Sequence, residues 1–206
     1  MPIPITSVIE ELRRTLTAVS YEQQEQLAAE IQKANRVFVA GAGRSGMMAR
    51  CFAMRLMHMG ITAYMVGEVV TPSIAAGDLL VIASGSGETA SLVSMAKKAK
   101  SLGASVATVT IYPQATIGTL SDAVVAIHAP TSKSAIDTGV QSVQPMGSLF
   151  NLPGLRYSDP NGEKANYRRG NVCATRKPGV NEYERIYHAL FDMFGPVQPG
   201  GVGQGP

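Results

Sequence analysis

The stretch GDLLVIASGSGET, residues 77–89, decides how this chain folds. Its LLVIA segment is apolar at every position, which is typical of a strand buried on both faces of a parallel sheet. The Gly- and Ser-rich loop SGSGET follows, and TASLVSMAKKAKSLG (residues 89–103) then places apolar residues at helical spacing. A buried strand, a tight loop and a helix form the repeating unit of an α/β domain.

The same unit recurs on both sides of this stretch. RVFVAG (36–41) precedes the loop AGRSG and the helical run MMARCFAMRLMHMG, and further apolar runs are ITAYMVG (61–67), SVATVTI (105–111) and AVVAIHA (123–129). Two amphipathic helices are predicted before them, over 5–16 and from Ser20 to about Lys33, the second with a capping box of Ser20 and Gln23. We therefore predict an α/β fold in which helices cover both faces of a five-stranded parallel sheet, preceded by N-terminal helices.

Composition excludes several classes of function. The chain has 206 residues, 45% of them hydrophobic and 16% charged, which suits one globular domain. The net charge of +3 comes without a basic stripe interleaved with aromatic residues in the first 150 residues, so no nucleic-acid partner is expected. Two cysteines without a C-x-x-C motif predict a reducing cytoplasm and no metal framework. No signal peptide and no apolar run of membrane-spanning length are found, so no membrane partner is expected.

Two glycine-rich loops carry the candidate chemistry. GAGRSG (41–46) matches G-x-G-x-x-G between a strand and a helix, which with Glu68 near the end of the next strand would suit a dinucleotide. SGSGET (84–89) differs, because Ser84, Ser86 and Thr89 offer three hydroxyls where a helix begins. Clustered hydroxyls and close-approaching backbone N–H groups at a helix N-terminus suit a sugar phosphate better.

VFVAGAGRSG, AMRLMHMG, GDLLVIASGSGET and PMGSLF together resemble the 6-phospho-3-hexuloisomerases, a family of sugar-isomerase (SIS) domain proteins. The resemblance covers nearly all of residues 1–150. It implies a flavodoxin-like three-layer αβα fold and interconversion of D-arabino-hex-3-ulose 6-phosphate with D-fructose 6-phosphate through an enediol, a step of formaldehyde fixation by the ribulose monophosphate pathway. It also implies a cytoplasmic homo-oligomer, a dimer or tetramer, that needs no cofactor and no metal.

The resemblance also assigns site residues. Ser45 is expected to contact the substrate, with Arg44 beside it. The loop formed by Ser84, Gly85, Ser86, Gly87, Glu88 and Thr89 is expected to hold the phosphate. Enediol chemistry further needs a base near the transferred proton and polarisation of the carbonyl oxygen.

The expected base falls at a discontinuity. In the family, the residue after GSLF is usually Glu, whereas Phe150 is followed here by Asn151, and the strand–helix alternation stops at that point. Back-translation offers a reason: in the shifted frame, Ala174 to Asn181 allow RHANLE, the family C-terminus, followed by a stop. We therefore expect residues 1–150 to form the SIS domain, 151–181 to be an out-of-frame segment in place of the C-terminal helix, and 182–206 to be a disordered read-through tail.

Two other functions stay open on this basis. A non-catalytic sugar-phosphate-binding SIS module is favoured by Asn151 in place of Glu. A nucleotide-dependent oxidoreductase is favoured by GAGRSG together with Glu68.

Overall fold

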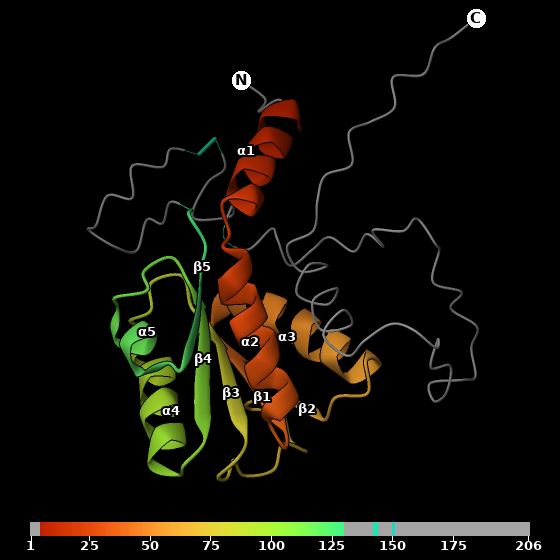
Figure 1. Ribbon diagram of the computed structural model, residues 1–206, viewed down its shortest axis with the longest axis vertical. Coiled ribbons are helices and arrows are strands. Elements are labelled where there is room, and N and C mark those ends of the chain that lie inside the picture. The colour runs from red at the N-terminus through yellow and green to blue at the C-terminus, as the bar shows by residue number, and fades with distance from the viewer. Residues whose placement is uncertain (1–4, 130–141, 144–149, 151–206) are drawn as a thin grey trace, which may run out of the picture.

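Five parallel strands form the sheet at the centre of the molecule, in the order β2-β1-β3-β4-β5 (Figure 1). The computed structural model describes residues 5–129, 142, 143 and 150. The strands are β1 (Val37–Gly41), β2 (Ala63–Met65), β3 (Leu79–Ala83), β4 (Ser105–Thr110) and β5 (Ala123–Ala126). This is the flavodoxin-like strand order, so the predicted fold class is confirmed.

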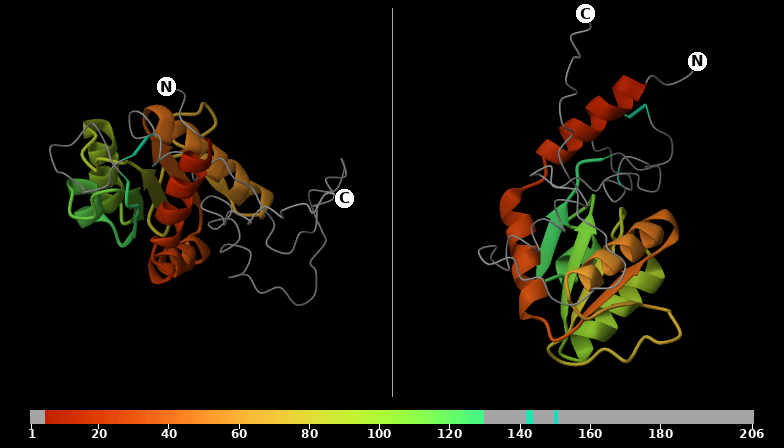
Figure 2. Two further views of the ribbon diagram at one scale, coloured as in Figure 1. Left: turned by 90° about the horizontal axis from the view of Figure 1, so that it is seen from above. Right: turned by 90° about the vertical axis from the view of Figure 1, so that its right-hand side faces the viewer.

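Helices cover both faces of the sheet. They are α1 (Ile5–Thr17), α2 (Tyr21–Lys33), α3 (Gly43–His58), α4 (Ala90–Ser101) and α5 (Thr116–Leu120). Figures 1 and 2 show α2 and α3 on one face, α4 and α5 on the other, and α1 extending beyond the sheet. Alternate residues of β1 face opposite layers, since Val37 and Val39 pack in the α2–α3 cluster and Phe38 in the α4–α5 cluster. The two hydrophobic layers therefore hold the carboxyl ends of the strands in fixed positions.

The beginnings of the helices agree in part with the sequence prediction. The Ser20 hydroxyl accepts a hydrogen bond from the N–H of Gln23 at 3.3 Å, as the capping box requires. The Gln23 side chain, however, accepts from the N–H of Ala126 at 2.9 Å and so joins α2 to β5. Helix α3 begins at Gly43, inside the glycine-rich loop, whereas the sequence predicted its start near Met47.

Ion pairs fix the amino edge of the sheet, opposite the carboxyl ends. Asp78, just before β3 and only 2% exposed, accepts two hydrogen bonds from Arg36 (Nε at 3.0 Å, Nη2 at 2.6 Å) and one from the Ala75 N–H at 2.8 Å. Burial alone would raise the pKa of Asp78, but the hydrogen bonds from Arg36 and Ala75 outweigh burial and lower it. The strands thus enter the sheet at positions fixed by an ionised pair.

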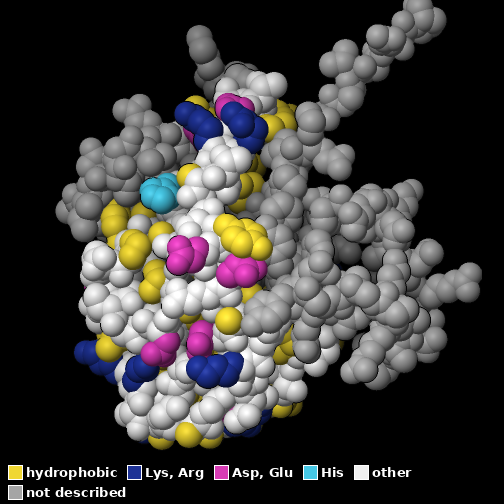
Figure 3. Space-filling model, viewed as in Figure 1, with side chains coloured by type: hydrophobic (Ala, Val, Ile, Leu, Met, Phe, Trp, Pro, Cys, Tyr) yellow, Lys and Arg dark blue, Asp and Glu magenta, His cyan; other side chains and the backbone are white. Residues whose placement is uncertain are grey.

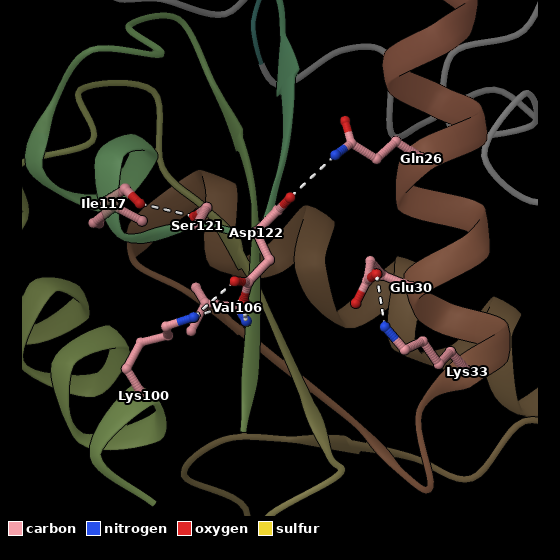
Figure 4. A network of polar contacts seen from close by, with 8 residues as sticks. All are labelled: Gln26, Glu30, Lys33, Lys100, Val106, Ile117, Ser121 and Asp122. Carbon is pink, nitrogen blue, oxygen red and sulfur yellow. Dashed lines mark hydrogen bonds and ion pairs between the residues drawn. The ribbon is translucent and has the colours of Figure 1, made fainter. Parts of the chain in front are cut away.

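Asp122 plays a similar role before β5. Figure 4 shows its carboxylate accepting from Lys100 Nζ at 2.7 Å and from the Val106 N–H at 2.9 Å, while its backbone carbonyl accepts from the Gln26 amide at 3.1 Å. One residue thereby ties α4, β4 and α2 to the start of the last strand.

The surface carries two kinds of pattern. On the face in Figure 3, acidic and basic side chains are interspersed. On α3, Met47, Met54 and Met57 are 65%, 49% and 46% exposed, and Val69 and Val70 after β2 are also exposed. These three methionines are therefore not part of the core of this chain.

Candidate active site

The two glycine-rich loops begin side by side at the carboxyl edge of the sheet. Gly41, at the end of β1, is paired in register with Ala83, at the end of β3. After β1 the chain moves outward to β2, and β3 then lies on the other side of β1, so the strand order reverses between the two loops. In open α/β sheets, ligands bind in the crevice at such a switch point.

The GAGRSG loop brings α3 against β1. A Cβ atom at Gly46 would lie 2.6 Å from the carbonyl oxygen of Gly41, so only glycine permits this approach. Gly43 has a φ of +56°, the left-handed conformation that glycine adopts without strain. Arg44, which is exposed, and Ser45, which is partly exposed, follow in the first turn of α3. The loop therefore presents both predicted substrate residues at the N-terminal end of a helix.

The SGSGET loop is organised by its own serines. The hydroxyl of Ser84, a buried residue, accepts from the N–H of Gly87 at 3.2 Å, and the hydroxyl of Ser86 accepts from the N–H of Glu88 at 3.3 Å. Thr89 is the N-cap of α4, with an extended backbone and no capping bond from its side chain. Ser86 and Thr89 are partly exposed, so they are the two hydroxyl residues of the loop that remain accessible to a ligand.

The end of β4 and the segment that follows it anchor the same loop from one side. The carbonyl oxygen of Gly85 accepts from the Ile111 N–H at 3.1 Å and from the Thr110 hydroxyl at 3.3 Å. The carbonyl oxygen of Gly87 accepts from the Ile117 N–H at 3.0 Å. Gly87 has a φ of +65°, and a Cβ atom there would lie 2.6 Å from the Cβ of Ala115. Backbone hydrogen bonds and one close approach therefore hold the loop against its neighbour.

Glu88 makes its contact with this same neighbour. Its carboxylate accepts from the N–H of Thr116, the first residue of α5, at 2.6 Å. This backbone hydrogen bond, followed by one with the Thr116 side chain, lowers the pKa of Glu88. Glu88 is therefore ionised at neutral pH and unsuited to act as a general acid.

Phe150 connects the end of the family-like sequence to the loop. It is 8% exposed, and a Cβ atom at Gly85 would lie 3.5 Å from its Cδ1 atom. Phe150 thus packs over the backbone of the SGSGET loop. Asn151, where the family base is expected, and the segments 151–181 and 182–206 lie outside the described residues.

The protein-family model that describes the SIS domain matches residues 30–152 of this chain. The chain belongs to the SIS domain family. A 3-hexulose-6-phosphate isomerase of Bacillus subtilis is 47% identical to it over 156 residues, which are 75% of this chain and 83% of that protein. A 3-hexulose-6-phosphate isomerase of Mycobacterium gastri is 45% identical over 146 residues, 71% of this chain and 72% of the relative. The resemblance drawn from the sequence motifs is thereby confirmed.

Solved structures of related proteins resemble this chain as well. One is a hypothetical protein from Methanococcus jannaschii, for which a molecular function of 3-hexulose-6-phosphate isomerase was inferred. It is 34% identical, with a TM-score of 0.60, and the match covers 73% of this chain and 80% of that chain. The sugar isomerase domain of a transcription factor from Sphaerobacter thermophilus is 21% identical with a TM-score of 0.57, over 74% of this chain and 87% of that one, and shows a likeness of fold.

Glu68, which in the sequence would suit a dinucleotide site, has a different role in this SIS domain. This residue follows β2, where an acidic side chain could bind a ribose, but its carboxylate forms an ion pair with Arg50 of α3. In this SIS domain, therefore, Glu68 joins the segment after β2 to α3. No cluster of three potential metal-binding side chains, and no helix long and apolar enough to cross a membrane, occurs among the residues that the structure describes.

Proposed function

We propose that this chain is an isomerase that interconverts D-arabino-hex-3-ulose 6-phosphate and D-fructose 6-phosphate in the cytoplasm. The observation that carries the proposal is the placement of the SGSGET loop. Its two accessible hydroxyl residues lie at the start of α4, next to the GAGRSG loop at the switch point of the sheet. The names of the relatives at 45–47% identity support the same substrate.

The phosphate would lie on the SGSGET loop. Ser86 and Thr89 would donate hydroxyl hydrogen bonds to it, and the N-terminal end of α4 would supply a favourable dipole. Ser84, Gly85, Gly87 and Glu88 would shape the loop around the anion. Arg44 and Ser45, on the neighbouring GAGRSG loop, would contact the sugar and its oxygens.

The reaction needs no external oxidant or reductant. Removal of the proton from C2 of the 3-ulose, with protonation of O3, gives a 2,3-enediol; return of a proton to C3 and loss of the O2 proton then leave the carbonyl at C2. A positive group near the carbonyl oxygen would stabilise the charge that develops there, a role that suits Arg44. The base would be a Glu at the position that Asn151 holds in this chain.

We further propose that residues 151–181 are an out-of-frame translation and that 182–206 are read-through. Support comes from the shifted-frame reading of residues 174–181 and from the match to the SIS domain, which ends at residue 152. On this proposal the chain binds sugar phosphate but isomerises it slowly, because an Asn side chain does not accept a proton at neutral pH. A non-catalytic binding module is the second candidate, favoured by Asn151.

A coupled assay tests the reaction. Purified chain is mixed with hexulose 6-phosphate, and the fructose 6-phosphate formed is converted to glucose 6-phosphate and oxidised with NADP. We expect slow turnover, and far faster turnover in a matched chain whose frame is restored after Phe150. Equal rates in the two proteins would contradict the frameshift, and no turnover in the restored chain would contradict the isomerase assignment.

We also propose that the chain forms a homo-oligomer. The support is the exposed apolar set on α3 and after β2, formed by Met47, Met54, Met57, Val69 and Val70. Solvent-exposed apolar groups of this kind are common at contacts between subunits.

A further inference from the structure

Glu88, which has no role in the proton transfer itself, accepts a hydrogen bond from Thr116 at the start of α5. We propose that Glu88 is a positioning residue, which holds the SGSGET loop against the start of α5 and does not touch the substrate. The inference rests on the proposed function, because it concerns how the phosphate loop of that site is held.

Several hydrogen bonds along the SGSGET loop attach it to β4 and to the chain that follows β4. Ser84 is bound through its N–H to the carbonyl of Val109 at 3.0 Å, Gly85 through its carbonyl to Ile111, and Gly87 through its carbonyl to Ile117. These bonds are made by the backbone and survive most substitutions. Glu88 provides the last attachment before α4 begins, and it is made by a side chain.

This last attachment borders the accessible hydroxyls. Glu88 lies directly before Thr89, and its own N–H donates to the hydroxyl of Ser86. Loss of the carboxylate would release the loop at the point between these two hydroxyls. Their spacing, which has to match the oxygens of one phosphate, would then no longer be held.

The negative charge of Glu88 distinguishes a positioning role from simple repulsion, because the two roles predict opposite changes in phosphate affinity when the charge is removed. A phosphate monoester is an anion, and a carboxylate close to it weakens its binding by repulsion. If Glu88 were a neighbouring charge and nothing more, its removal would tighten phosphate binding. If Glu88 positions the loop, removal of its acceptor oxygens weakens binding despite the loss of a like charge.

Three variants separate the two effects. Glu88→Ala removes both the charge and the acceptor, whereas Glu88→Gln removes the charge and keeps an amide oxygen that can accept from Thr116. Thr116→Pro removes the donor instead. Thr116 is the first residue of α5, where proline is tolerated, and Ala115 has φ −69° and ψ 167°, an extended conformation that suits the residue before proline.

The measurement is the dissociation constant of fructose 6-phosphate by calorimetry, with full-length chains whose thermal unfolding confirms that they are folded. We expect Glu88→Ala and Thr116→Pro each to weaken binding about three- to tenfold, Glu88→Gln to bind as tightly as wild type or more tightly, and the double variant Glu88→Ala/Thr116→Pro to be no weaker than either single variant.

Two results would overturn the inference alone: tighter or unchanged binding by Glu88→Ala, or Glu88→Gln as weak as Glu88→Ala. A wild-type chain that binds neither fructose 6-phosphate nor inorganic phosphate would overturn the proposed function and this inference with it. The wild-type titration therefore separates the two failures.

Discussion

Replacement of Gly46 by Ala tests how α3 is packed on β1. An added Cβ would meet the carbonyl oxygen of Gly41 at 2.6 Å and its carbonyl carbon at 3.0 Å. Both neighbours are backbone atoms, so no change of rotamer relieves the clash, and α3 has to move outward by roughly 0.5 Å or more. Overpacking of this kind destabilises a protein by about 1–3 kcal/mol, whereas the better helix propensity of Ala returns about 1 kcal/mol.

We therefore expect Gly46→Ala to lower the free energy of unfolding by up to about 2 kcal/mol, measured by urea denaturation. It should also weaken fructose 6-phosphate binding, because the outward shift moves the start of α3 away from the SGSGET loop. Gly43→Ala is the matched control, since its Cβ would have no neighbour within 4 Å and its cost comes from the φ of +56° alone. A Gly46→Ala chain as stable as wild type with unchanged affinity would refute the close-approach argument.

Three further variants test other parts of the account. Asp78→Asn should lower the free energy of unfolding by about 2–3 kcal/mol, because it weakens a largely buried pair with Arg36. Since the pKa of Asp78 is lowered in the folded state, its contribution is present above about pH 5 and is lost as the pH falls. Wild type should therefore lose stability between about pH 5 and 3 more steeply than Asp78→Asn, and parallel profiles would contradict this. Ser86→Ala should weaken fructose 6-phosphate binding about tenfold in calorimetry, while Ser94→Ala, at an exposed position on α4, should leave it unchanged; equal effects would remove Ser86 from the site. Met54→Glu should reduce the mass measured by light scattering, and a wild-type chain that is already monomeric would contradict the oligomer.

The strands could be predicted from the sequence because each of them is a continuous apolar run. LLVIA, RVFVAG and SVATVTI are apolar along most of their length, and each became a strand within two residues of its expected bounds. The short helix α5 was not predicted, since its five residues, TIGTL, are too few to show a helical period. The early start of α3 was missed because glycines at positions 43 and 46 are poor helix formers; close packing against β1 outweighs their low propensity.

The sequence predicted where in the fold the candidate site lies, but not all of the contacts within it. The two glycine-rich loops meet at the switch point as parallel topology requires. The attachment of Glu88 to Thr116 could not be read from the sequence, because the two residues are 28 positions apart and meet through a backbone N–H. The same holds for Phe150 over Gly85, which depends on tertiary packing. The substrate contact of Ser45, with Arg44 beside it, and the phosphate-holding role of the SGSGET residues remain predictions.

On the proposed function, the GAGRSG and SGSGET loops together bind a sugar phosphate and not a dinucleotide. Calorimetric titration of the purified chain with fructose 6-phosphate, and separately with NADH, tests it most directly. We expect fructose 6-phosphate to bind, inorganic phosphate to compete with it, and NADH to give no heat of binding. Binding of NADH without binding of fructose 6-phosphate would contradict a sugar-phosphate site at these loops.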